Sequence, residues 1–228
     1  MADIFRCRKF WAVAAGGFCG AYPLYFTITW LPFYLVHEQH LSMPEMVNHA
    51  ALYYTVDATA ALFTGWVTDF WIRRGCDIGL MRKSTMALGW MTAAIGFLGC
   101  SSAGTHSYFL WLMVMAVGCG TGNACFWSFA QTMAGPKAIG KWSGLTAGFL
   151  NLAGVICPAL TGFTLDRTGH FCRAMVITAV VCVIGAMIWI FFLGEVKEVD
   201  WRRLQKRESA FSATRPSSPG SQIAKGFL

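Results

Sequence analysis

The sequence places one carboxylate deep inside a long apolar stretch. Asp57 is the only Asp, Glu, Lys or Arg well inside any of six apolar runs. A carboxylate at membrane depth has to face a water-filled cavity, find a partner or be protonated, because exposure to lipid costs several kcal/mol. Asp57 is therefore a candidate for proton coupling or substrate contact. The alternative is a shifted span that leaves Asp57 near the outer interface, next to Tyr53 and Tyr54.

A group of charged residues follows where the same apolar run ends, in the stretch GWVTDFWIRRGCDIGLMRK. Asp69 lies one turn after Gly65, and four cations come next: Arg73, Arg74, Arg82 and Lys83. A charge network between an acid at a helix end and cations in the next loop predicts a conformational latch that is broken and remade. The alternative is that the cations only mark the cytoplasmic side, which explains neither the acid nor the glycine.

Several uncharged polar side chains inside other apolar runs could line a pathway for a small molecule. The candidates are Tyr25, Trp127, Gln131 and Asn151. An amide in hydrocarbon needs a hydrogen-bond partner, and a bond to a neighbouring helix would also supply one. Substrate contact and structural hydrogen bonding between helices therefore both remain open for these residues.

Patterns of other chemistries are absent from the sequence. It has no P-loop, HExxH or GxSxG motif, its nine cysteines form no CxxC pair, and its five histidines show no metal spacing. We therefore expect no enzyme, no metal and no cofactor. The net charge of +7 does not indicate nucleic-acid binding, because no basic stripe is interleaved with aromatic residues.

The composition is that of a multi-pass membrane protein. Hydrophobic residues make up 56% of the 228 residues and charged residues only 13%. A helix needs about 20 apolar residues to cross a bilayer. Six runs meet this need and predict an all-α bundle of six transmembrane helices over 10–194, at about 10–36, 50–72, 84–103, 107–133, 142–164 and 172–194.

The cations predict the orientation of this bundle. Of the 18 Lys and Arg, 16 lie in segments on one side of the six spans, and only Arg167 and Arg173 lie on the other. By the positive-inside rule both termini are cytoplasmic, as an even number of spans requires, and the protein belongs in the cytoplasmic (inner) membrane. Residues 1–9 are then a cytoplasmic N-terminus, and residues 195–228 a tail that is basic and then disordered.

A short internal repeat suggests how the spans are related. Thr64-Gly65-x-x-x-Asp69 ends the second run and Thr161-Gly162-x-x-x-Asp166 ends the fifth. The two matches are three spans apart and so face opposite sides of the membrane. This predicts two three-helix repeats related by inversion.

Four stretches of the chain resemble the anion:cation symporter family of the major facilitator superfamily. YFTITWLPFYLV resembles its seventh helix, and GWVTDFWIRRGCDIGLMRK its loop between helices eight and nine. QTMAGPKAIGKWSGLTAGFLNLAGVICPALTGFTLDRTGHF is similar to the tenth and eleventh helices, and FFLGEVKEVDW to the exit from the twelfth. The resemblance runs from about Phe10 to Trp201.

The resemblance implies a carrier of small organic anions, often sugar acids or other carboxylates, commonly coupled to protons. Asn151 matches a family asparagine that contacts substrate, and Trp127 approximately matches a tryptophan near the end of the tenth helix. Family members have twelve spans, and the six here correspond to the second half. A substrate site would then be completed by a second six-helix half or by a self-paired dimer. The alternative is a membrane scaffold or truncated remnant that does not transport.

Overall fold

The computed structural model describes residues 2–5, 7–104 and 107–193. The predicted tail from residue 195 onward lies outside these residues. The helices are α1 (Ala2–Phe5), α2 (Arg8–His37), α3 (Met43–Arg73), α4 (Ile78–Ser102), α5 (Tyr108–Asn123), α6 (Phe126–Thr168) and α7 (Cys172–Met187), which continues as the π-helical turn η1 (Ile188–Phe192). The described part of the chain contains no strand, which confirms the predicted all-α fold.

The long helix α6 consists of two rods that meet at Gly135. This residue has φ 65° and ψ 166°, a left-handed conformation that glycine adopts without steric cost. Pro136 follows and suits the first turn of the next rod, because its missing N–H has no partner there. The rod before the break continues α5, so the bundle has six rods, as predicted. The fourth predicted run, 107–133, crosses from α5 into α6.

Three of the rods are long and apolar enough to cross a membrane by composition alone. They are Tyr108–Pro136, Ala138–Thr168 and Cys172–Phe192. Helices α2, α3 and α4 are as long, but their tyrosines, tryptophans, threonines and glycines lower the mean hydropathy. Among the side chains that α2 and α3 present to the cavity described below, only Tyr25 and Asp57 are polar.

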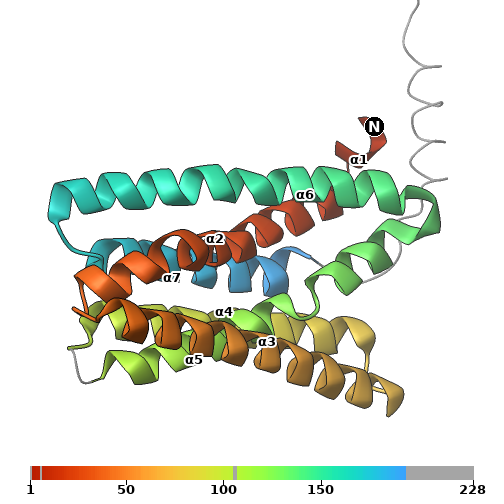
Figure 1. Ribbon diagram of the computed structural model, residues 1–228. Coiled ribbons are helices and arrows are strands. Elements are labelled where there is room, and N and C mark those ends of the chain that lie inside the picture. Colours follow the sequence, from red (N-terminus) through yellow and green to blue (C-terminus); the bar gives the residue numbers. More distant parts are fainter. Residues whose placement is uncertain (1, 6, 105–106, 194–228) are drawn as a thin grey trace, which may run out of the picture.

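The contacts between the helices stay the same if the first three helices, α2, α3 and α4, are exchanged with the last three, α5, α6 and α7. Helix α2 packs on α6, as α5 packs on α3, and α4 packs on α7 between these pairs. The second rod of α6 lies at one edge of the bundle, and α3 lies toward the opposite edge beside α5 (Figure 1). This is the arrangement expected if residues of α2, α3 and α4 correspond to those of α5, α6 and α7.

Glycines bring the backbones of α3, α4 and α5 into direct contact. A Cβ added at Gly118 of α5 would lie 2.2 Å from the backbone nitrogen of Ala93 in α4. On the other face of α5, a Cβ added at Gly120 would lie 2.1 Å from the backbone oxygen of Asp57 in α3. Small residues permit this close approach, which drives helix association where lipid removes the hydrophobic effect.

We predict that Gly118→Ala destabilises the bundle by about 1–3 kcal/mol, because the new methyl group meets backbone atoms that cannot move independently of α4. Thermal unfolding of the purified protein in detergent measures the change. The matched control is Gly144→Ala on α6, where a Cβ would meet nothing within 4 Å. Equal melting temperatures for the two variants would contradict the close contact between α4 and α5.

Candidate functional site

A cavity of about 420 Å³ opens between the helices at mid-bundle. Its walls come from α2, α3, α4, the α5–α6 junction, the second rod of α6, and η1. The lining residues are Gly16, Gly17, Gly20, Ala21, Leu24, Tyr25, Asp57, Met86, Trp90, Asn123, Phe126, Trp127, Ala147, Leu150, Asn151 and Trp189. The lining combines aromatic faces, two amides, a phenol and one carboxylate, and it contains neither Lys nor Arg.

The cavity brings together four of the five side chains that the sequence singled out for substrate contact or coupling. Asp57, Tyr25, Asn151 and Trp127 all line it, although they come from three different helices. The fifth candidate, Gln131, is exposed on the first rod of α6 and is not part of the lining. Asn123 joins the site at the end of α5.

Asp57 lies near the middle of α3, which runs from Met43 to Arg73. Its side chain is partly buried, and its backbone oxygen lies against Gly120 of α5. No other side chain in the described ranges forms a salt bridge with it. A carboxylate placed in this way can bind a proton or accept a hydrogen bond from a bound molecule.

Tyr25 and Asn151 join the two walls of the cavity formed by α2 and α6. The Tyr25 hydroxyl donates a hydrogen bond to Oδ1 of Asn151 at 2.6 Å, and Nδ2 of Asn151 donates to the carbonyl of Ala147 at 2.9 Å. Gly154 makes room for the phenol, because a Cβ there would lie 2.8 Å from the Tyr25 ring. The phenol and the amide remain at the cavity surface, where a hydroxyl or carboxylate of a ligand could replace the hydrogen bond between them.

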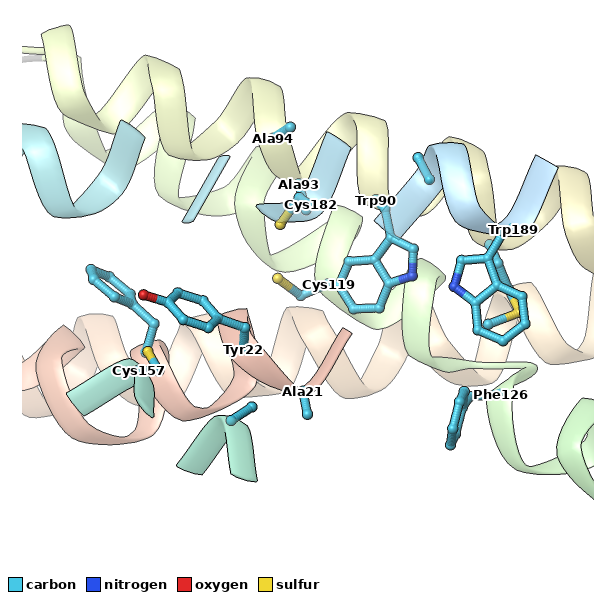
Figure 2. Close-up of a cluster of buried hydrophobic side chains, with 14 of the residues drawn as sticks. Ala21, Tyr22, Trp90, Ala93, Ala94, Cys119, Phe126, Cys157, Cys182 and Trp189 are labelled. Atoms are coloured by element: carbon cyan, nitrogen blue, oxygen red, sulfur yellow. The ribbon is translucent and has the colours of Figure 1, made fainter. Parts of the chain in front are cut away.

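Two tryptophans that we did not single out from the sequence form another wall of the site. The Trp90 ring lies against Gly20, and the Trp189 ring lies against Gly16 one turn away on α2. Their indole nitrogens turn toward the space between the two rings (Figure 2). Both side chains are almost fully buried. The glycine spacing of four in α2 is the signal that could have indicated two bulky partners.

The basic loop between α3 and α4 has a defined geometry. Gly75 adopts φ 96° in the turn, and the Asp77 carboxylate accepts a hydrogen bond from the Leu80 backbone N–H at 2.7 Å, which caps α4. Burial lowers the pKa of Lys83, against the opposing field of Asp77. The turn at Gly75 and the cap at Asp77 therefore give the loop a defined conformation.

The predicted latch residues lie on both sides of this loop: Gly65, Asp69 and Arg73 on α3, Arg74 in the loop itself, and Arg82 and Lys83 on α4. The guanidinium of Arg82 donates to Oγ1 of Thr132 at 3.1 Å and to the carbonyl of Ser128 at 3.4 Å, both on the first rod of α6. Arg74 lies over the Phe70 ring, while Asp69 and Arg73 are exposed. Within the described ranges no side chain forms a salt bridge with Asp69, and Gly65 has open space around it.

Within the described residues, no group of three His, Cys, Asp or Glu is placed to hold a metal ion. The arrangement provides hydrogen bonds, aromatic contacts and one protonatable group. These are the elements of a binding site for a small polar molecule.

The profile of the Major Facilitator Superfamily matches residues 13–226. A D-galactonate transporter of Escherichia coli O6:H1 is 29% identical over 197 residues, which cover 84% of this chain and 44% of that protein. A hexuronate transporter of Bacillus subtilis is 29% identical over 184 residues, 75% of this chain and 42% of that one.

One further sequence relative and one solved structure agree with these matches. A probable galactarate/D-glucarate transporter of E. coli K12 is 25% identical over 193 residues, covering 82% of this chain and 43% of that protein. The chain thus spans less than half the length of these relatives. The inward-open xylose transporter of E. coli has the same fold over 97% of this chain and 55% of its own, with a TM-score of 0.56 and 11% identity. The expected half of a major facilitator fold is confirmed.

We predict that the Tyr25–Asn151 hydrogen bond couples α2 to α6. Interhelical bonds of this kind in membrane proteins contribute about 0.6 kcal/mol on average and at most about 1.7 kcal/mol. Tyr25→Phe, Asn151→Ala and the double variant, compared by unfolding in detergent, should give a coupling energy in this range. Fully additive effects would mean that the two side chains do not interact.

Proposed function

This chain belongs to the Major Facilitator Superfamily, and on that premise we propose that it forms one half of a secondary transporter for small organic anions of the sugar-acid class, coupled to protons. It is a multi-pass integral membrane protein. The observation that carries the proposal is the mid-bundle cavity, in which Asp57, Tyr25, Asn151 and Trp127 meet. Carriers of alternating access hold their substrate between helices near the bilayer midplane, and we assign that role to this cavity.

The chemistry of the cavity suits a hydroxylated carboxylate. Phenol and amide groups at Tyr25, Asn123 and Asn151 can donate to and accept from hydroxyl groups. The indole of Trp127, which is 46% exposed, provides a flat face for the apolar side of a sugar acid, and the buried rings of Trp90 and Trp189 form part of the cavity wall. The relatives named as galactonate, galactarate/D-glucarate and hexuronate transporters support the same substrate class.

The charge of the cavity supports coupling to protons. Asp57 is its one ionisable carboxylate, and no Lys or Arg lines it. An ionised Asp57 repels an incoming anion, and at low dielectric this repulsion is large. Protonation of Asp57 removes this repulsion. Binding of the proton therefore raises the affinity for the anion, and binding of the anion raises the affinity for the proton. Such mutual favouring is the thermodynamic requirement for symport.

We assign the substrate site to an interface that another six-helix unit completes. Helix α3 buries only Tyr53 and Thr68 fully, and only 17% of the apolar window in Ala138–Thr168 is buried. The second unit is a complementary half or a second copy of this chain. Alternating access would come from the two bundles rocking around the cavity, with both termini in the cytoplasm and the protein in the inner membrane.

The basic loop would act as the latch of this movement. Arg82 holds the start of α4 to the first rod of α6, next to the cavity wall at Trp127. Asp69 is exposed at the end of α3 and available for the opposite state. Gly65, Arg73, Arg74 and Lys83 would complete the network that is exchanged between states.

Uptake into liposomes tests the transport proposal. We expect D-galactonate, D-glucarate or a hexuronate to accumulate when an inward proton gradient is imposed on the reconstituted chain, either alone as a self-paired dimer or together with a six-helix partner. Absence of uptake in both arms would favour a scaffold or remnant instead.

Asp57→Asn should abolish the acceleration by the proton gradient while expression is kept, because the amide cannot bind the proton. Asp166→Asn is the matched control, since Asp166 is exposed at the end of α6. A gradient response that survives in Asp57→Asn would make Asp57 a structural residue.

For the latch, we predict that Asp69→Asn and Arg82→Gln each slow uptake several-fold with substrate affinity unchanged. The double variant should be no slower than the slower single variant, because both break one network. Affinity is measured by binding at equilibrium and the rate by initial uptake. Additive losses, or an equal fall in affinity, would contradict the latch.

A further inference from the structure

A second hollow of about 490 Å³ lies on the outside of the bundle, between the start of α2 and the end of α7. It is lined by Arg8, Trp11, Ala12, Ala15, Ile184, Ile188 and Phe192. The four residues of α2 follow one helix face at spacings of three and four, and the three residues of α7 and η1 follow another at spacings of four. Two antiparallel stripes therefore form the walls of a groove, the outer groove.

The sequence of both helices explains why the groove is open. Ala12 and Ala15 present only methyl groups, so α2 has a shallow surface there. On the facing helix, Trp189 turns into the bundle and packs against Gly16. Ile188 and Phe192 remain outside, in the π-helical turn η1. The walls that face outward are apolar, with Phe192 71% exposed.

One end of the outer groove is charged and the rest is not. Arg8 is the first residue of α2 and the only charged residue of the lining. Trp11 stands beside it, with its indole N–H donating to the Phe5 carbonyl at 2.7 Å. The rings of Phe5, Phe10 and Phe149 pack around that indole. Tryptophan in such clusters is typical of the level of the lipid headgroups.

We propose that the outer groove binds an anionic phospholipid, such as phosphatidylglycerol, from the leaflet on the side of the N-terminus. The phosphate pairs with the Arg8 guanidinium, which matches it with two parallel N–H donors. One acyl chain follows Ala12 and Ala15 inward between Ile184 and Ile188. From Arg8 to Ala15 the groove extends about 10 Å along α2, at 1.5 Å per residue.

Charge argues against a second copy of this chain as the occupant. A dimer formed through this same face would be isologous and, with its two-fold axis along the membrane normal, would place both Arg8 side chains at the same depth of one interface. The lining contains no acidic residue that could neutralise the charge of the two Arg8 side chains. A lipid supplies the opposite charge at the charged end and an apolar chain along the rest. The proposal does not depend on transport.

Lipid binding to the purified full chain tests the site. Native mass spectrometry with phosphatidylglycerol and phosphatidylcholine of identical acyl chains should show tighter binding of phosphatidylglycerol. Arg8→Gln should weaken phosphatidylglycerol binding about tenfold, which corresponds to about 1.4 kcal/mol, and weaken phosphatidylcholine binding less, because the choline cation offsets the charge of its phosphate. Arg173→Gln is the matched control, because Arg173 is exposed and lines no part of the groove.

A variant that fills the groove tests the acyl part separately. Ala15→Trp should weaken binding of both lipids, and an unchanged circular dichroism spectrum and melting temperature without lipid show that it still folds. Equal binding of the two lipids, an equal effect of Arg173→Gln, or an Ala15→Trp variant that binds normally would each overturn the proposal. A dimer that Ala15→Trp abolishes would identify a second copy as the occupant instead.

Discussion

Direct contact between helix backbones is the constraint on which this bundle depends. In a membrane, lipid tails cover apolar side chains as well as another helix does, so helices associate mainly through close packing. Helix α5 meets α4 at Gly118 and α3 at Gly120, and in both places a single methyl group would overlap backbone atoms. Asp57 belongs to this contact, because its carbonyl faces Gly120. The position of the carboxylate in the cavity is thus constrained by a glycine on another helix.

The cavity follows from the same use of small residues. Along α2, Gly16 and Gly20 are contacted by Trp189 and Trp90, while Gly154 of α6 leaves space for the Tyr25 ring. A large ring placed against a glycine fills the volume that a side chain would take, and its edge then becomes the wall of the remaining space. The same pairs of glycine and aromatic residues therefore determine both the helix packing and the shape of the cavity.

Charge is divided between the inside and the ends of the bundle. Asp57 is the one charged residue of the cavity lining, whereas cations such as Arg8 and Arg82 lie near the starts of α2 and α4. At these ends a guanidinium can reach backbone carbonyls, hydroxyl groups or lipid phosphates without being moved into hydrocarbon. In the proposed transport cycle, an anion would enter the centre of this bundle when the acid is neutral or when a neighbouring unit supplies a cation.

The sequence by itself determined the helical class, the number of rods and the choice of Asp57, Tyr25, Asn151 and Trp127 as candidate residues. Hydrophobicity, charge and an acid in an apolar run are local properties that can be counted along the chain. Only the tertiary structure decided which of these residues meet. It left Gln131 outside the cavity, added Trp90 and Trp189, and gave Arg82 its partners on α6. Which face of a helix turns inward depends on its packing against helices distant in the sequence, and no local pattern specifies that rotation.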